Sequence, residues 1–316
     1  MKAITVADFG MQPILSDMPK PTAGQGQLLV KLAAASVNPY DWKVIDGLLK
    51  GHVQHDFPFI PGSDGAGTIE ALGECVSGHQ VGDKIYGQFF TTPLGHGSYA
   101  EYVVVPQEGA LDTVPQNISL EDAAALPTAA MTANALVVRT GLEDGPIVFI
   151  VGATGGVGSF AVQIAAGKGL QVIATASPAA AENIKQLGAT VIIDHTQGNI
   201  VDQLKEKYPQ GIDALIDMVS DKETFAALAT QVKPGGYALT TVFVADEKAL
   251  EKQGITGENF ELQANANALQ VITQLVESGA LKLPPIQKVP LEKAPEALAQ
   301  SRSGKTKGKL VITIGE

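Results

Sequence analysis

The stretch Ile147-Val148-Phe149-Ile150-Val151-Gly152-Ala153-Thr154-Gly155-Gly156-Val157-Gly158 decides the fold of this chain. Its first five residues form a continuous apolar run, which is typical of a strand covered on both faces of a sheet. The glycines that follow predict a tight turn. After the turn, apolar residues recur with the period of a helix, at Val157, Phe160, Ala161, Ile164 and Ala165. The stretch therefore predicts a strand, a glycine turn and a helix in succession.

The alternation of strand and helix continues to about residue 244. Strands are expected at 171–176, 190–194, 214–217 and 237–244, with helical patterns between them. One of these helices carries Phe225, Leu228, Ala229 and Val232, and the Pro234-Gly235-Gly236 turn is expected to stop it. Repeated strand–helix–strand units build a parallel, doubly wound sheet of the Rossmann type, so the expected fold class is α/β.

The two ends of the chain have a different pattern. Up to about residue 120, short β-rich runs are separated by glycine and proline, which favours an interrupted, mainly antiparallel sheet resembling a β-barrel. A helix at 265–278, a Pro284-Pro285 break and a closing strand at 310–314 are expected in the tail. We expect the tail to rejoin the first part, giving one domain from residues 1–122 and 265–316 and an inserted α/β domain from residues 123–264.

Composition and charge exclude several classes of protein. Of the 316 residues, 45% are hydrophobic, which is enough for a large buried core. The formal net charge of −11 disfavours nucleic acid as a partner. Cys75 is the only cysteine, so neither a disulfide framework nor a four-cysteine zinc module is expected. No signal peptide and no membrane span are apparent, and we expect a cytoplasmic protein.

The glycine turn between the first strand and the first helix has the placement of a dinucleotide-binding fingerprint. Glycines let main-chain N–H groups approach a pyrophosphate, and the helix directs the positive end of its dipole at that anion. Ala153 stands where the usual fingerprint has its first glycine. The alternative is a tight turn that binds no ligand. The expected cofactor contacts in the turn are Gly152, Thr154, Gly155, Gly156 and Val157.

The residues after the second strand bear on the choice of dinucleotide. NAD-binding folds place an acid there to hold the ribose 2′-hydroxyl, and this chain has Ala176-Ser177-Pro178 instead. An acid would repel the 2′-phosphate of NADP, so its absence favours NADPH over NADH. Ser177 is expected to donate to that phosphate or to cap the next helix. His195, after the third strand, is expected to reach the adenosine phosphate or to act as a capping or surface residue.

Six further motifs occur in order: ASVNPYDWK at 35–43, PGSDGAG at 61–67, GDKI at 82–85, YAEY at 99–102, LP and TA at 126–127 and 132–133, and KGKL at 307–310. This series resembles the medium-chain dehydrogenase/reductase superfamily, specifically its zinc-independent quinone oxidoreductase branch and the related enone (alkenal) reductases. The resemblance runs nearly from end to end of the chain.

The resemblance implies a GroES-like substrate domain, an inserted Rossmann domain, and commonly a homodimer. It implies an NADPH-dependent enzyme that transfers hydride to a quinone or an α,β-unsaturated carbonyl compound. Thr132 is implied to lie near the nicotinamide. Thr241, Val242 and Phe243 follow a late strand and are expected to line the ring crevice, because open α/β sheets bind ligands at the carboxyl ends of their strands.

The resemblance also bears on metal. Zinc-dependent members of the superfamily have a cysteine where this chain has Asn38, and a His-Glu pair where it has Ser63-Asp64. The five histidines are scattered, and His52 and His55 are interpreted as solvated loop residues. We expect no metal, which favours substrates that need little Lewis-acid polarisation.

Three side chains near residue 40 are candidate donors to an oxygen that gains negative charge. Asn38 offers an amide at the position of the zinc-ligating cysteine, Tyr40 offers a phenol, and Lys43 offers an ammonium. The alternatives are a turn-former, a packed aromatic residue and a solvated charge, respectively. Asp41 is expected to orient the loop as an acceptor, because a carboxylate near pH 7 has no proton to give.

Two other functions stay open. A 2-enoyl thioester reductase would need a basic entry for the carrier phosphate, and its support is the basic run Arg302, Lys305, Lys307 and Lys309. The same run is otherwise interpreted as a solvated loop, or as the cation missing near Ser177. A non-catalytic NADPH-binding sensor or structural protein is the third reading, which intact Asn38, Asp41 and the glycine turn argue against.

Overall fold

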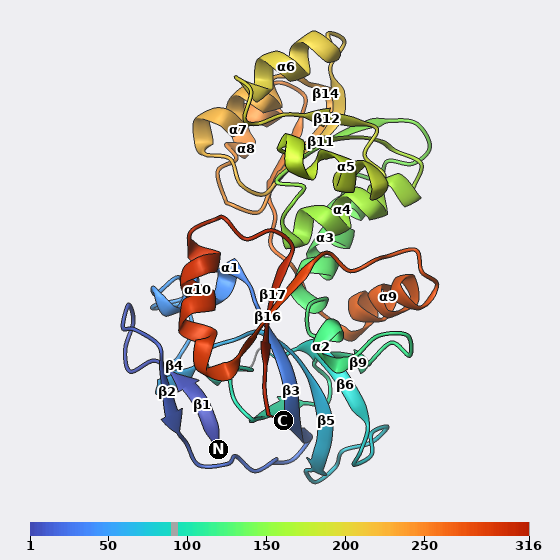
Figure 1. The fold of residues 1–316 in the computed structure, drawn as a ribbon. Coiled ribbons are helices and arrows are strands. Elements are labelled where there is room, and N and C mark those ends of the chain that lie inside the picture. The colour runs from blue at the N-terminus through green and yellow to red at the C-terminus, as the bar shows by residue number, and fades with distance from the viewer. Residues whose placement is uncertain (90–93, 316) are drawn as a thin grey trace. The chain divides into compact units, whose positions relative to one another are not determined.

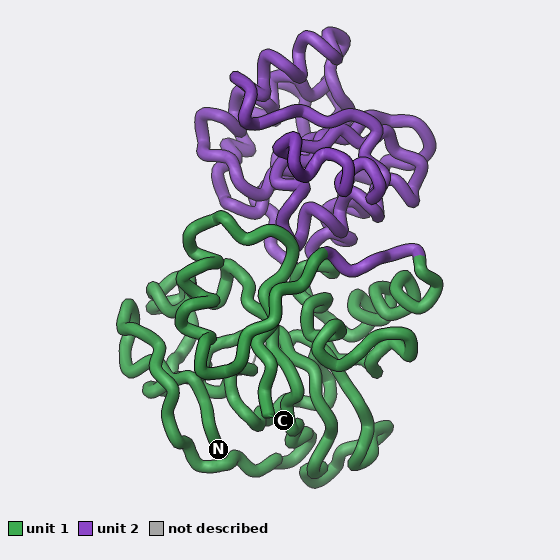
Figure 2. The backbone as a smooth tube through the Cα atoms, in the orientation of Figure 1, with its two compact units in different colours: residues 1–131, 264–279, 285–316 green, residues 132–263, 280–284 purple. Residues whose placement is uncertain are grey.

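A computed structural model describes residues 1–89 and 94–315 of the chain and divides it into two compact units (Figures 1 and 2). Unit 1 comprises residues 1–131, 264–279 and 285–316, and unit 2 comprises residues 132–263 and 280–284. The expected first division, after residue 122, lies nearer the N-terminus than the observed one. The observed division falls inside helix α3 (Pro127–Arg139), whose first five residues belong to unit 1.

Unit 2 is built on one six-stranded sheet in which every neighbouring pair is parallel. In sheet order the strands are β12 (Val191–Ile193), β11 (Gln171–Thr175), β10 (Ile147–Val151), β13 (Ile212–Asp217), β14 (Val232–Thr240) and β15 (Thr256–Asn259). The first strand of this series therefore lies inside the sheet, beside the second and the fourth, which is the doubly wound order predicted. Phe149 and Ile150 of β10 are completely buried, as a strand covered on both faces requires.

Helices alternate with these strands, as predicted, with one difference. They are α4 (Gly156–Gly167), α5 (Pro178–Gln186), α6 (Ile200–Lys207), α7 (Lys222–Ala229) and α8 (Glu247–Glu251). The prediction that the Pro234-Gly235-Gly236 turn stops α7 is wrong, because Val232 already pairs with Ile212 as the first residue of β14. The register then shifts, and this irregularity accommodates the proline and the glycines within the strand. The strand also ends at Thr240 and not at residue 244.

Unit 1 contains the mainly antiparallel sheet that was predicted. Its path is β16-β17-β3-β5-β6-β9, with β8 also paired to β3, and only β16 and β17 run parallel. Two further pairs are β1 with β2 and β4 with β7. The strands are β1 (Lys2–Thr5), β2 (Ile14–Asp17), β3 (Gln27–Val37), β4 (His55–Ile60), β5 (Asp64–Leu72), β6 (Lys84–Gln88), β7 (Leu94–His96), β8 (Tyr102–Pro106), β9 (Ala110–Thr113), β16 (Ile286–Pro290) and β17 (Lys309–Thr313). The helices are α1 (Pro39–Ile45), α2 (Leu120–Ala123), α9 (Ala266–Glu277) and α10 (Ala294–Arg302).

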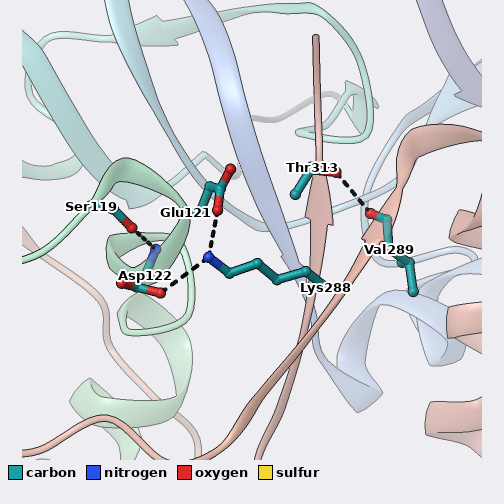
Figure 3. Close-up of polar contacts among 6 residues, drawn as sticks. All are labelled: Ser119, Glu121, Asp122, Lys288, Val289 and Thr313. Carbon is teal, nitrogen blue, oxygen red and sulfur yellow. Dashed lines mark hydrogen bonds and ion pairs between the residues drawn. The ribbon is translucent and has the colours of Figure 1, made fainter. Parts of the chain in front are cut away.

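The C-terminal tail is part of this sheet. Strand β17 pairs antiparallel with the end of β3, with Leu310 opposite Val37. Figure 3 shows a second contact of the tail, in which Lys288 of β16 points toward Glu121 and Asp122 in the first turn of α2 and forms ion pairs with them. These charges are partly exposed, so each pair contributes at most about 1 kcal/mol. The tail therefore joins unit 1 mainly through the β17–β3 ladder.

Within residues 1–89 and 94–315, every helix is too short or too polar to cross a membrane.

Gly158 in α4 is expected to be intolerant of a side chain, because a Cβ there would overlap the carbonyl oxygen of Gly152. We expect Gly158→Ala to lower the midpoint of urea unfolding clearly, since main chain must shift. Gly167→Ala in the same helix is the matched control, because Gly167 is exposed and a Cβ there meets nothing within 4 Å. This control should leave stability unchanged or raise it by about 0.5–1 kcal/mol. Equal effects of the two substitutions would contradict the packing described.

Candidate functional site

Helix α1 begins directly after β3 and contains three of the four predicted catalytic residues. Its N-cap is Asn38 in an extended conformation, and Pro39 fixes the first helical position. Asp41 reaches back so that its Oδ2 accepts the main-chain N–H of Asn38 at 2.7 Å. This contact fixes the start of the helix.

Hydrogen-bond donors enclose the carboxylate of Asp41. Its Oδ2 also accepts from the Tyr99 phenol at 2.8 Å, and its Oδ1 accepts from the Ser63 N–H at 3.1 Å and the Ser63 hydroxyl at 2.9 Å. Burial raises the pKa of Asp41 to about 6 in spite of these donors. Burial also raises the pKa of the Tyr99 phenol well above its usual range, so Tyr99 keeps the proton that it donates. Asp41 thus serves as an acceptor that orients the start of α1.

Asn38 links two buried groups of opposite charge. Its Nδ2 donates to Asp64 Oδ2 at 2.8 Å, and its Oδ1 accepts from Lys309 Nζ at 2.7 Å. A flipped amide would present NH₂ to the ammonium and oxygen to the carboxylate, so electrostatics fix its orientation. Asp64 is completely buried and also accepts from the main-chain N–H and the hydroxyl of Thr128. We call the following residues the buried polar network: Asn38, Asp41, Ser63, Asp64, Tyr99, Thr128 and Lys309.

Lys309 is the functional residue that the sequence most clearly failed to reveal. It opens β17 and is 3% exposed, so its interpretation as part of a solvated loop is wrong. Burial lowers the pKa of its ammonium and raises the pKa of the Asp64 carboxyl, while the attraction between the two charges opposes both shifts. The one signal of its burial in the sequence was its place directly before the apolar run at 310–312. A lysine at the start of a buried strand needs a hydrogen-bonded or charged partner.

A pocket lies beside α1 within unit 1, and we call it the α1 pocket. Its cavity volume is about 30 Å³, and about 360 Å³ when the open space at its mouth is included. Most of its wall is apolar and comes from Val44, Phe59, Ile60, Pro61, Phe89 and Leu94. Its polar side chains are those of Tyr40, Asp41, Ser63 and His96. An apolar wall with a few polar groups is typical of a small-molecule site.

Of the predicted donors, the structure brings Tyr40 to the α1 pocket, whereas Asn38 and Lys43 are not among the described residues that line it. Both ends of the Asn38 amide are engaged and the residue is 3% exposed, which contradicts the expectation that its NH₂ donates to a substrate oxygen. The Lys43 ammonium lies 5.7 Å from the centre of the Trp42 ring, a cation–π contact. Asn38 therefore positions the pocket wall, and Lys43 stands outside it.

The interpretation of His55 as a solvated loop residue is wrong. It is the first residue of β4, it is half-buried, and its Nδ1 lies 2.8 Å from the Val53 carbonyl oxygen. Its ring packs against those of Phe9, Phe57 and Phe59. His52 is exposed, as expected. The aromatic neighbours 2 and 4 residues along the chain were the missed signal, because alternate residues of a strand share one face.

In unit 2 the glycine turn fits a dinucleotide phosphate. Gly152 has a φ of 90°, which favours glycine, and its N–H donates to Thr175 Oγ1 at 2.9 Å. The N-cap of α4 is Gly155, which has no side chain to occupy the N–H groups of the first turn. A Cβ at Gly158 would fill the space that the Gly152 carbonyl uses. Uncapped N–H groups at the start of a 12-residue helix are suited to hold an anion.

Most of the other predicted cofactor residues lie at the same edge of the sheet. Ser177 follows β11, His195 follows β12, and the segment 241–243 follows β14, so all of them stand at carboxyl ends of parallel strands. Ser177 is the N-cap of α5, yet its hydroxyl makes no capping hydrogen bond. Thr132 differs, because it is buried on α3 and follows no strand.

Asp217 at the end of β13 was also missed. It is completely buried, and its Oδ1 accepts from the N–H groups of Val219 and Ser220 at 2.9 Å. Its Oδ2 has no hydrogen-bond partner among the described residues. Burial raises the pKa of this carboxyl. It stands where β13 neighbours β10, which is the switch point of the sheet, and an acid at the end of a central apolar strand was the signal.

The residues present do not fit a zinc site. Among residues 1–89 and 94–315 no group of three or more His, Cys, Asp or Glu side chains converges as metal ligands would. The ammonium of Lys309 already contacts Asn38, and the amide of Asn38 already donates to Asp64. A fixed cation at this point repels a metal ion, and an amide NH₂ cannot serve as a ligand.

Comparison with known proteins gives two matching family models. Residues 24–116 match the model described as alcohol dehydrogenase GroES-like domain, and residues 187–312 match the model described as zinc-binding dehydrogenase.

Similar proteins match over nearly the whole chain. The chain is 31% identical over 323 residues to 2-methylene-furan-3-one reductase of Solanum lycopersicum, covering 99% of this chain and 79% of that protein. It is 30% identical over 329 residues to the chloroplastic NADPH-dependent alkenal/one oxidoreductase of Arabidopsis thaliana, with the same coverage. The solved quinone oxidoreductase of Coxiella burnetii superposes with a TM-score of 0.90 at 28% identity, covering 100% of this chain and 99% of that one.

Lys309→Met is expected to lower the free energy of unfolding by about 3–5 kcal/mol, because it leaves the buried Asp64 charge without its cation. Urea unfolding measures this effect. The exposed Lys307 offers the matched control, and Lys307→Met should change stability by less than about 0.5 kcal/mol. A Lys309→Met protein as stable as the wild type would show that the buried polar network does not depend on this charge.

Asp41 is expected to make the free energy of unfolding fall as the pH rises from about 4 to about 6. In this range the unfolded chain, whose Asp pKa is about 4, releases the proton that the folded state keeps, at up to ~1.4 kcal/mol per pH unit. Urea unfolding of wild type and Asp41→Asn at both ends of this range isolates the contribution. The wild type should lose more stability than the variant, and an equal loss in both proteins would contradict the raised pKa.

Proposed function

The chain belongs to the medium-chain dehydrogenase/reductase superfamily, in its quinone oxidoreductase branch, and we propose that it is an NADPH-dependent, metal-independent reductase of quinones and α,β-unsaturated carbonyl compounds. The observation that carries the proposal is the glycine turn at the switch point of a doubly wound sheet, with its helix uncapped by any side chain. The names of the relatives, an alkenal/one oxidoreductase and a quinone oxidoreductase, support the substrate class.

The nucleotide would be held by unit 2. Main-chain N–H groups of the glycine turn at Gly155, Gly156 and Val157 suit its pyrophosphate, with Gly152 and Thr154 shaping the turn. The hydroxyl of Ser177 makes no capping hydrogen bond, so it can donate to a 2′-phosphate. This supports NADPH over NADH.

The remaining predicted contacts complete the cofactor proposal. We keep His195 for the adenosine phosphate and Thr132, Thr241, Val242 and Phe243 for the nicotinamide end. Phe243, with a φ of 60° and 61% of its surface exposed, is the least enclosed of the four.

When bound, the nicotinamide supplies a hydride, that is one hydrogen with two electrons. With an enone, the hydride forms a C–H bond at the β-carbon, the electrons of the C=C bond move toward the carbonyl oxygen, and a proton from water or a side chain completes the saturated ketone. A quinone takes the same hydride and one proton to give the hydroquinone. In both cases negative charge grows on an oxygen, which needs hydrogen-bond donors.

Tyr40 is the proposed donor to that oxygen. Its side chain lines the α1 pocket, whose apolar wall strengthens a hydrogen bond to a developing charge. Asn38 and Asp41 are positioning residues, because their side chains hold the start of α1 and with it Tyr40. This assignment needs no Lewis acid, in accord with a buried polar network that already contains its own cation.

The enoyl thioester alternative loses part of its support, because Lys309 of the basic run is buried and cannot meet a carrier phosphate. We propose further that the protein is homodimeric, as its branch of the superfamily suggests, and that it acts in the cytoplasm.

The proposed function predicts oxidation of NADPH, followed at 340 nm, when a quinone or an enone is added, and slower oxidation of NADH. We expect Tyr40→Phe to lower kcat for an enone by about 10²-fold or more, because a donor to the growing negative charge is lost. Tyr208→Phe, at the end of α6, is the control and should behave as the wild type. A Tyr40→Phe kcat within a factor of two of wild type would remove Tyr40 as the donor.

An enoyl thioester is assayed in parallel as a third substrate. Tight NADPH binding without turnover of any of the three would favour a non-catalytic sensor and contradict the proposal.

A further inference from the structure

We propose that His96 is a second substrate-binding donor of the α1 pocket, which holds the same oxygen as Tyr40 during reduction. This inference rests on the proposed function and adds a residue to it.

The polar groups of the α1 pocket leave few candidates for contact with a substrate. Its polar side chains are those of Tyr40, Asp41, Ser63 and His96. Asp41 and Ser63 are almost fully buried and bond to each other through Ser63 Oγ and Asp41 Oδ1 at 2.9 Å. They belong to the buried polar network, so among the residues that the structure describes, Tyr40 and His96 are the polar side chains of the pocket left to contact a ligand. Of the two, His96 is exposed at the surface of the pocket.

The main chain holds His96 in a fixed position. His96 is the last residue of β7 and lies opposite Ile60 of β4 in a parallel pair. The following N–H, of Gly97, donates to the Ile60 carbonyl at 2.8 Å.

The glycines on either side of His96 pack closely against residues 56–61 of the same chain. A Cβ at Gly97 would overlap the carbonyl oxygens of Ile60 and Pro61, and one at Gly95 would lie 3.3 Å from Asp56 Cβ. The segment 95–97 is therefore bare backbone against β4, and it presents a single side chain, the imidazole. A donor on a fixed frame needs little reorganisation as charge develops on the substrate.

The other histidines of unit 1 do not share this setting. His55 packs among phenylalanine rings, His52 is exposed in the loop before β4, and His79 lies in the loop between β5 and β6. Among the described residues, His96 is the histidine that lines the α1 pocket. Imidazole carries an N–H in either tautomer, so it donates to a carbonyl, enolate or quinone oxygen without first gaining charge.

The main test compares His96→Gln with His52→Gln, a matched control on the same unit. We expect His96→Gln to lower kcat/KM for 2-cyclohexenone and for 1,4-benzoquinone by about 10–100-fold, because one of two donors is weakened. The dissociation constant of NADPH, measured by calorimetry, should stay the same in both variants. Unchanged kcat/KM in His96→Gln, within a factor of two for both substrates, would overturn the inference while leaving the proposed function intact.

A second measurement does not depend on turnover. The chain has five histidines, so their imidazole signals are few in the NMR spectrum, and His96→Gln assigns that of His96 by its disappearance. Titration of the wild type with 2-cyclohexenone in the absence of NADPH should shift the His96 signal to saturation and leave that of His52 in place. If the His96 signal does not move, the inference fails even where NADPH turnover is observed. If it moves but no substrate is reduced, the proposed function fails and the binding role of His96 stands.

Discussion

A buried ammonium group imposes the strongest constraint on unit 1. Lys309 is 3% exposed, and an ammonium inside a protein must be paired and hydrogen-bonded. The Asn38 amide bridges this ammonium to Asp64, because its oxygen accepts from Lys309 and its NH₂ donates to the carboxylate. Asp64 in turn accepts from Thr128 at the start of α3. This chain of contacts joins the last strand, the end of β3, the start of β5 and the first turn of α3. The start of α1, and Tyr40 on it, takes its position from these fixed groups.

Unit 2 obeys a simpler rule. A parallel sheet with helices between its strands collects the carboxyl ends of those strands at one edge, and the chain switches direction beside β10. The glycine turn stands at that point because only glycine tolerates both the φ of Gly152 and the close approach of α4. Strand order and turn chemistry therefore determine where an anion can bind, independently of the surface side chains.

Local patterns revealed the fold well, because the strand, the glycine turn and the helix of residues 147–167 each follow from neighbours in the sequence. The end of α7 was predicted wrongly because Pro234 and Gly235 read as a stop, whereas an irregular strand accommodates them. The candidate site was harder to predict from the sequence than the fold. Burial of Lys309 depends on Asn38, 271 residues away, and the same contact withdraws the Asn38 amide from the pocket. His96 lines the pocket because β7 pairs with β4. The sequence around residue 96 contains no pattern that predicts this pairing.

The central claim is that a protein cation, and not a metal, organises the substrate unit of this reductase. Elemental analysis of protein purified without added metal, combined with NADPH turnover before and after treatment with a chelator, tests it most directly. The account predicts far less than one zinc ion per chain and turnover that the chelator does not change. One zinc ion per chain, lost on chelation together with activity, would contradict it.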